Sequence, residues 1–142
     1  MKLLLLNVLC LLVSITYAQR TQLTIEVVGL QNRKGQIVLD IFQTVKGFPM
    51  KTEHAIQRQI LKISTNDTLE FIVNNLNEGE YAFALFHDEN SNEELDLNFI
   101  GIPKEGAAAS NNAKGLMSPP SYDEAKFQLK KETVMAIKIL YF

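Results

Sequence analysis

The sequence predicts an all-β protein, a single antiparallel Greek-key β-sandwich of seven strands with one long loop. Three observations predict it. Apolar residues recur at every second position through much of the chain, which is typical of strands with one buried face. Turn-forming residues separate these runs at short intervals. No stretch shows a helical period of useful length.

The first four strands are expected at 23–27, 37–42, roughly 56–63 and 69–73. In the first two, a leucine, isoleucine or valine occupies every second position. Gly35 makes the turn between them, and Asn66-Asp67 makes the turn between the third and fourth strands. The third strand is less regular, because its isoleucines do not keep a strict period of two.

The last three strands are expected at 81–86, 125–130 and 133–141. The 81–86 run is apolar on both faces, which favours a central strand. In the final strand, Lys138 indicates that one face is exposed to solvent, so the opposite face, with Ile137 and Ile139, should point to the core. The link at 87–120 is unusually long for a compact domain, and such links are commonly functional.

The N-terminus predicts export. Lys2 precedes a mostly apolar run from Leu3 to Ile15, and Ala18 closes a stretch suited to cleavage. The run is shorter than the ~20 residues that a transmembrane helix needs. We therefore expect a signal peptide at 1–18 and one β-sandwich domain at 19–142, secreted or periplasmic.

Composition narrows the class further. Cys10, the only cysteine, lies within the predicted leader, so the domain would fold without disulfides, which favours a bacterial source. The formal net charge of −2 becomes −3 once Lys2 is removed, which argues against nucleic-acid binding. No second hydrophobic segment is present to span a membrane.

The stretch directly after the 81–86 run suggests a calcium site. Oxygen-bearing side chains stand at alternate positions: Asp88, Asn90, Asn92, Glu94 and Asp96. Calcium takes six to eight hard oxygen ligands, and a D-x-N-x-N turn curls its oxygens around the ion. In such a loop the position of Glu94 supplies a main-chain carbonyl, and that of Asp96 a side chain or a bridging water.

Two residues depart from the usual calcium loop. Glu93 stands where glycine normally adopts a positive φ, a conformation that costs a non-glycine residue about 1 kcal/mol. Phe99 stands where a bidentate glutamate is usual, so a further carboxylate must come from Glu105, with Glu89 and Asp123 as weaker candidates. Any affinity should be weak, with a Kd of roughly 10⁻⁴–10⁻³ M. A solvated acidic turn without an ion remains the open alternative.

Other chemistry has less support in the sequence. His87 beside Asp88 could act as a general base, but we favour a histidine at a strand end that bonds a loop carbonyl. A zinc site is not expected, because the domain has no cysteine and only His54 as a second histidine. The sequence contains no nucleophile-elbow, zinc-protease or phosphate-loop motif.

Several stretches together resemble a known family. They lie at 76–82, 87–92, 101–106, 110–112 and 121–127. With H-D-x-N-x-N and G-I-P-K-E-G in this order, the chain resembles the exported bacterial domain of unknown function 2141. The resemblance implies a periplasmic or secreted β-sandwich of transthyretin-like or carboxypeptidase-regulatory-like type, and it carries over no activity. The strand pattern itself predicts the immunoglobulin/transthyretin-like fold class. Glu93 replaces a usual glycine of the family, and Ala107-Ala108-Ala109 replaces Tyr-Gly-Phe.

Three functions remain as hypotheses. The first is a non-enzymatic exported module whose 87–113 loop is ordered by calcium and presents a recognition surface. Its ligand could be a protein or a glycan, and the few aromatic residues near the loop, Phe99 and Tyr122, favour a protein. The second is a small hydrolase-like enzyme that uses His87 with Asp88 or Glu105. The third is a purely structural domain whose long loop covers a sheet edge.

Overall fold

The computed structural model describes residues 21–65, 68–116 and 118–142. The predicted leader and the predicted turn at Asn66-Asp67 lie outside these ranges. Eight strands are present: β1 (Gln22–Val28), β2 (Gln36–Phe42), β3 (Gln57–Lys62), β4 (Glu70–Asn74), β5 (Gly79–Asp88), β6 (Ala107–Ala109), β7 (Phe127–Leu129) and β8 (Glu132–Lys138). Three short helices accompany them: 3₁₀ turns at Thr52–His54 and Ser110–Asn112, and α1 (Tyr122–Ala125).

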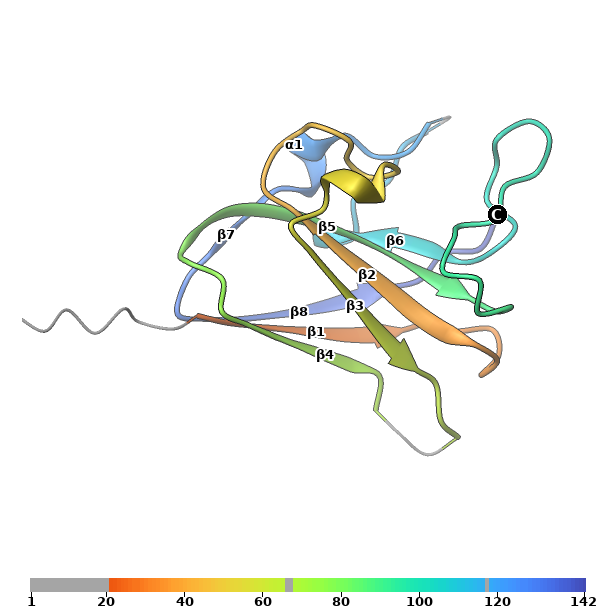
Figure 1. Ribbon diagram of the computed structural model, residues 1–142, viewed down its shortest axis with the longest axis horizontal. Coiled ribbons are helices and arrows are strands. Elements are labelled where there is room, and N and C mark those ends of the chain that lie inside the picture. The colour runs from red at the N-terminus through yellow and green to blue at the C-terminus, as the bar shows by residue number, and fades with distance from the viewer. Residues whose placement is uncertain (1–20, 66–67, 117) are drawn as a thin grey trace, which may run out of the picture.

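The strands form two sheets that lie face to face (Figure 1). One sheet has the order β4-β1-β8. The other has the order β3-β2-β5-β6, with β7 paired to the first residues of β5. The all-β expectation is confirmed, and no helix in the described ranges is long and apolar enough to cross a bilayer.

The arrangement differs from the expected one in strand number and in one pairing. The described ranges contain eight strands instead of the expected seven, and β8 runs parallel to β1. The turn at Lys130-Lys131 carries the chain from β7 in one sheet to β8 in the other. The N–H of Gln22 donates to the carbonyl of Lys131 at 2.8 Å, so β1 and β8 both start at this end of the molecule.

The core lies between the sheets and is built from alternate residues. From β1 come Leu23 and Ile25, and from β2 come Ile37 and Leu39, all completely buried. Ile137 of β8 and Ile139, just after it, also face this core, while Val134 and Lys138 are exposed, as the alternation predicted. Each large apolar side chain buried in this way contributes about 1.5–3 kcal/mol.

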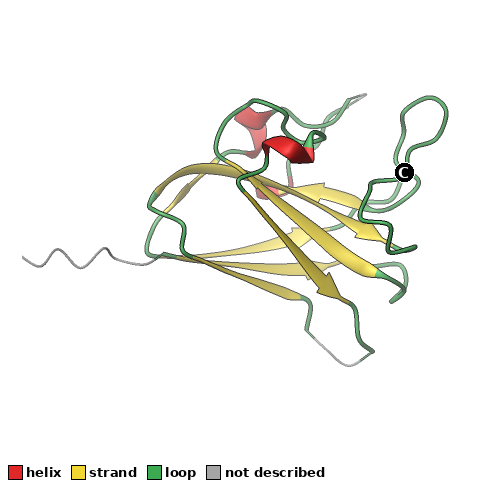
Figure 2. Ribbon diagram, viewed as in Figure 1, coloured by secondary structure: helices red, strands yellow, loops and turns green. Residues whose placement is uncertain are grey.

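β2 is buried on both faces, because a second layer covers the outside of its sheet. The 43–56 connection and α1 lie over this outer face (Figure 2). Phe42 packs edge-to-face on Phe48, with ring centroids 5.4 Å apart. The buried Asp40 accepts two hydrogen bonds from Arg58 of β3, at 2.7 and 2.8 Å. The expectation that 81–86 is a central strand is also met, since β5 pairs with β2, β6 and β7.

Two elements were not expected from the sequence. The strand predicted from residue 125 begins only at Phe127, because α1, a single helical turn, extends to Ala125. Ser121 and Glu124 form a capping box around that turn, an S-x-x-E signal that the sequence contained. The 87–120 link contains the short strand β6, which consists of three alanines. The sequence did not predict this strand, because alanine has low strand propensity.

Candidate functional site: an acidic loop at the end of the central strand

The candidate loop begins where β5 ends. Asp88 is the last residue of β5 and stands opposite Gln36, the first residue of β2. From there the chain forms a compact turn over 88–96, which we call the acidic loop, and then a projecting hairpin over 97–103. Both lie at one end of the two sheets, on the right of Figure 1.

Asp88 organises the acidic loop from a completely buried position. Its Oδ1 accepts the N–H of Asn92 at 3.1 Å. Its Oδ2 accepts the N–H of Glu93 at 2.8 Å and the side-chain amide of Gln36 at 2.8 Å. One carboxylate therefore ties the turn to the first residue of the neighbouring strand.

Asn90, Asn92 and Asp96 face one another across the loop. The Nδ2 of Asn90 donates to Asp96 Oδ2 at 2.6 Å, and that of Asn92 donates to Asp96 Oδ1 at 3.4 Å. The Oδ1 of Asn90 accepts the N–H of Asn92, and the Oδ1 of Asn92 accepts the N–H of Glu94. In this geometry the amide nitrogens of both asparagines point toward the Asp96 carboxylate.

Glu105 returns to the loop from 16 residues beyond Glu89. Its Oε1 accepts the N–H of Glu89 at 3.0 Å, and its Oε2 accepts the N–H of Asp96 at 3.1 Å. The side chain is 5% exposed. Burial raises the pKa of Glu105 above its ordinary value, the two N–H bonds oppose this, and the charges of Asp96 and Asp88 raise the pKa further.

The structure thus brings together five of the six residues predicted as calcium ligands: Asp88, Asn90, Asn92, Asp96 and Glu105. Glu94 is exposed and enters the network through its main-chain N–H. Of the weaker candidates, Glu89 accepts a hydrogen bond from Asn32, and Asp123 lies on α1 in an ion pair with Lys126.

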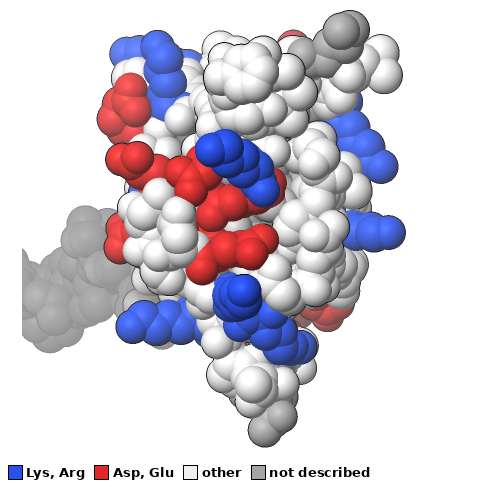
Figure 3. Space-filling model, turned by 90° about the vertical axis from the view of Figure 1, so that its right-hand side faces the viewer, with Lys and Arg blue, Asp and Glu red and all other residues white. Residues whose placement is uncertain are grey.

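Within the described part of the chain, the carboxylates of this network, Asp88, Asp96 and Glu105, form no ion pair with a cationic side chain. Within the same ranges, no three Asp, Glu, His or Cys side chains converge as a metal site. Any cation held here would therefore depend on the amide and main-chain oxygens as well. Figure 3 looks onto this end of the molecule and shows acidic side chains gathered between lysines and arginines.

Glu93 adopts the strained conformation expected of it. Its φ is 64°, and that of Ser91 is 59°, both in the left-handed region that glycine favours. The main-chain carbonyl of Glu93 accepts a hydrogen bond from Arg58 at 3.3 Å. The positive-φ turn expected from the D-x-N-x-N spacing is therefore present even though glycine is absent from it.

His87 is completely buried on the face of its sheet that is turned toward the core. Its Nε2 lies 2.7 Å from the carbonyl of Lys34, which can only accept, so this nitrogen carries the proton. Its Nδ1 then accepts from the Tyr141 hydroxyl at 2.6 Å. The histidine bonds a loop carbonyl, as we favoured, and a buried imidazole with both nitrogens engaged does not support the hydrolase hypothesis.

Other residues of the shared motifs hold the fold together. The buried Ser110 Oγ donates to the carbonyl of Ala125 at 2.6 Å and accepts the N–H of Phe83 at 3.0 Å. Asn112 bonds the main chain of β8 at Ala136 and Lys138, so it covers part of that strand's open edge. The sequence interpretation assigned these residues no role, although a Ser-Asn-Asn run after a strand is a recognisable turn signal.

The fold and this loop define a small all-β domain with an acidic, internally hydrogen-bonded loop at one end of its sheets. The chain belongs to the bacterial family described as "Uncharacterized protein conserved in bacteria (DUF2141)", whose family model matches residues 25–137. The match confirms the family expected from the motifs. No curated protein and no solved structure matches the chain.

Proposed function

We propose that this protein is a non-enzymatic, exported β-sandwich module whose acidic loop binds calcium weakly and orders a recognition surface over 87–113. The proposal includes a secreted or periplasmic location, removal of the leader at 1–18, and Greek-key connections of the transthyretin-like kind. A protein ligand fits the surface better than a glycan, because Phe99 is the one aromatic residue within 88–113.

The observation that carries the proposal is the negative charge of Asp88, Asp96 and Glu105, which no ion pair among the described residues neutralises, although these three side chains do not by themselves converge as a metal site. Asp88 and Glu105 are buried, and both are satisfied only by neutral N–H donors. Burying carboxylates that repel one another is unfavourable unless a positive charge lies near. A divalent cation would supply that charge.

The donor set fits calcium better than magnesium or zinc. It consists of hard carboxylate and amide oxygens on an irregular loop, and calcium tolerates such irregular coordination whereas magnesium requires a near-ideal octahedron. The asparagine amide groups that now face Asp96 would have to give way to the ion. Losing hydrogen bonds worth about 1 kcal/mol each is in keeping with weak affinity.

Thermal melting of residues 19–142 in calcium, in magnesium and in chelator tests the proposal. At ten times the Kd, calcium should stabilise the fold by about 1.4 kcal/mol, and at one hundred times by about 2.7 kcal/mol. Magnesium at the same concentrations should have a much smaller effect. An unchanged melting temperature in calcium would instead favour the purely structural domain.

Two matched variants locate the effect. Asp96→Asn removes a carboxylate from the centre of the network and should abolish the calcium-dependent shift. Glu94→Gln removes the same charge from an exposed neighbour in the same loop and should leave most of the shift intact. Equal losses in both variants would indicate a diffuse electrostatic response rather than a site.

A further inference from the structure

The hairpin over 97–103 projects from the acidic loop as a separately ordered unit. Leu97 and Pro103 form an antiparallel bridge at its base. The side chain of Asn98 accepts the N–H groups of Ile100 and Ile102 at 3.0 and 2.9 Å, and its main-chain N–H donates to Ile102. These bonds lie within the hairpin itself and hold it in shape.

Its tip is apolar and exposed. Phe99 is 99% exposed and Ile100 is 64% exposed. A side chain built at Gly101 would meet no atom within 4 Å, so the tip stands clear of the domain. An ordered loop that places an aromatic and an aliphatic side chain in water is typical of a contact surface, because such residues dominate the energy of protein interfaces.

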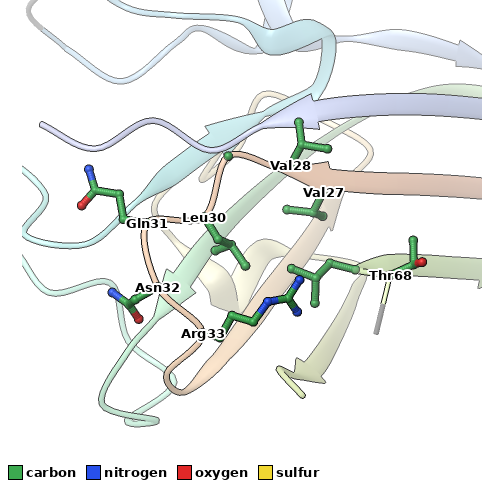
Figure 4. Close-up of a pocket in the computed structure, with 9 residues that line it drawn as sticks. Val27, Val28, Leu30, Gln31, Asn32, Arg33 and Thr68 are labelled. Atoms are coloured by element: carbon green, nitrogen blue, oxygen red, sulfur yellow. The ribbon is translucent and has the colours of Figure 1, made fainter. Parts of the chain in front are cut away.

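A groove on the same molecule has complementary properties. It has a volume of about 460 Å³ and lies between the 29–33 connection and the start of β4. Val27 and Leu69, which belong to the buried core, form its floor, the exposed Val28 and the half-buried Leu30 lie beside them, and Arg33 also lines it (Figure 4). Arg33 is exposed, and one of its contacts is a hydrogen bond from its guanidinium to the carbonyl of Ser64 at 2.8 Å, which lies at this edge.

The two features also match in charge and lie at the same end of the sheets. Asp96 leads into the hairpin, and the exposed Glu93 and Glu94 precede it, whereas the groove carries Arg33 with Lys34 beside it. The register of β2 against β5 and the Asn32–Glu89 hydrogen bond place the groove's connection next to the acidic loop. Figure 3 shows acidic and basic side chains sharing this face.

We propose that this face joins two copies of the chain, with the 97–103 hairpin of each copy inserted into the groove of the other. A two-fold axis makes both contacts at once, which is the arrangement of most closed dimers. The acidic loop beside the hairpin would then face the basic rim of the groove. The same acidic loop disfavours an anionic membrane as the occupant, because it would repel the headgroups.

The expected dimer is weak. Two such insertions bury on the order of 1,000 Å² in total, at the lower limit of specific interfaces. Sedimentation velocity of residues 19–142 from about 10 μM to 1 mM, in chelator, should show a concentration-dependent dimer. Chelator keeps this test independent of calcium binding. A wild-type chain that stays monomeric throughout would overturn the proposal.

Single variants identify the residues. Phe99→Ser should weaken the dimer at least tenfold, which corresponds to about 1.4 kcal/mol. Val28→Glu should do the same from the groove side, and its exposed position makes the fold tolerant of the change. Val45→Ser is the matched control, since Val45 is 71% exposed on a different connection. A control variant that weakens the dimer as much as Phe99→Ser would contradict the assignment.

Mixing the two variants tests the hairpin–groove pairing itself. Each homodimer has both contacts damaged, but a dimer of one Phe99→Ser copy and one Val28→Glu copy retains one intact hairpin in one intact groove. The mixture should therefore associate more strongly than either variant alone. If it does not, the hairpin does not dock in this groove. Pelleting of the monomeric wild type with vesicles of anionic phospholipid would assign the hairpin to membranes instead, and would also overturn the proposal.

Discussion

At the scale of single residues, the acidic loop combines a favourable network with local strain. Asp88 satisfies the main-chain N–H groups of Asn92 and Glu93, and this requires Glu93 to adopt a φ of 64°. A left-handed conformation is unfavourable for a residue with a Cβ atom and nearly free for glycine. The network around Asp88 therefore holds Glu93 in a conformation that its own backbone disfavours.

Replacing Glu93 with glycine should consequently stabilise the domain. We expect Glu93→Gly to raise the free energy of unfolding by up to about 1 kcal/mol, measured by urea denaturation. The adjacent Glu94, whose φ is not positive, is the matched control. Glu94→Gly should lower stability by roughly 0.5–1 kcal/mol, because glycine only adds unfolded-state entropy there. Changes of the same sign in both variants would contradict the strain argument.

At the scale of elements, α1 is a single helical turn that covers part of one face of a sheet. Its residues Tyr122 and Ala125 are buried against the outer face of the β2–β5 sheet. The capping box begins it, with the Ser121 hydroxyl accepting from the Glu124 N–H while the Glu124 carboxylate accepts from Ser121. Hydrogen bonds from the main chain and side chain of Ser121 lower the pKa of Glu124.

This element predicts a pH-dependent effect of Ser121→Ala. At neutral pH the substitution should destabilise the domain by about 1 kcal/mol, as for other N-cap losses. A carboxyl whose pKa is lower in the folded state stabilises the fold above its unfolded pKa, and this stability disappears as the pH falls through the folded pKa. The difference in melting temperature between wild type and Ser121→Ala should thus shrink in acid. Thr44→Ala, at an exposed position, should show no such narrowing.

At the scale of the whole molecule, burial is unequal between the central strand β2 and the hairpin at the end of the sheets. β2 is buried on both faces and pairs with strands on both sides. The 97–103 hairpin, in contrast, contacts solvent around its whole tip. Regions with few buried contacts open locally at little cost, whereas central strands open only when the whole domain unfolds.

Hydrogen exchange should reproduce this contrast. In dilute solution, amides of β2 and β5 should be the slowest to exchange, with protection approaching that of global unfolding. Amides of the 97–103 hairpin should exchange many times faster, and calcium should slow exchange mainly in the acidic loop. Measurement by mass spectrometry at a concentration below dimer formation checks this. Slow exchange at the hairpin under those conditions would show that its hydrogen bonds resist local opening.

Much of the architecture was accessible from sequence patterns, for local reasons. Apolar residues at alternate positions predicted which strand faces are buried, because a strand turns successive side chains to opposite sides. The examples are Leu23, Ile25 and Val27 in one segment and Ile137 and Ile139 in another. The position of Glu93 at a positive φ followed from the spacing of the D-x-N-x-N turn. The family was also accessible, since its motifs recur in order along the chain.

Other features depend on residues far apart in the chain. The burial of Asp40 and Phe42 requires Arg58 and the 43–56 connection to cover the outside of β2, and no local pattern encodes that layer. The parallel pairing of β1 with β8 arises because the chain changes sheets at Lys130-Lys131. The role of Ser110 as a link between Phe83 and Ala125 likewise follows from long-range packing.

The amino-acid pattern thus established an all-β family member with an oxygen-rich turn after its central strand, because periodicity and turn chemistry are properties of neighbouring residues. Folding brought together residues that are distant in the sequence. It placed Glu105 at Asp96, buried His87 against Tyr141, and left an apolar hairpin exposed at the end of the sheets that also carries the groove lined by Arg33. Those juxtapositions arise from packing between sheets and connections, where distance along the chain gives no measure of distance in space.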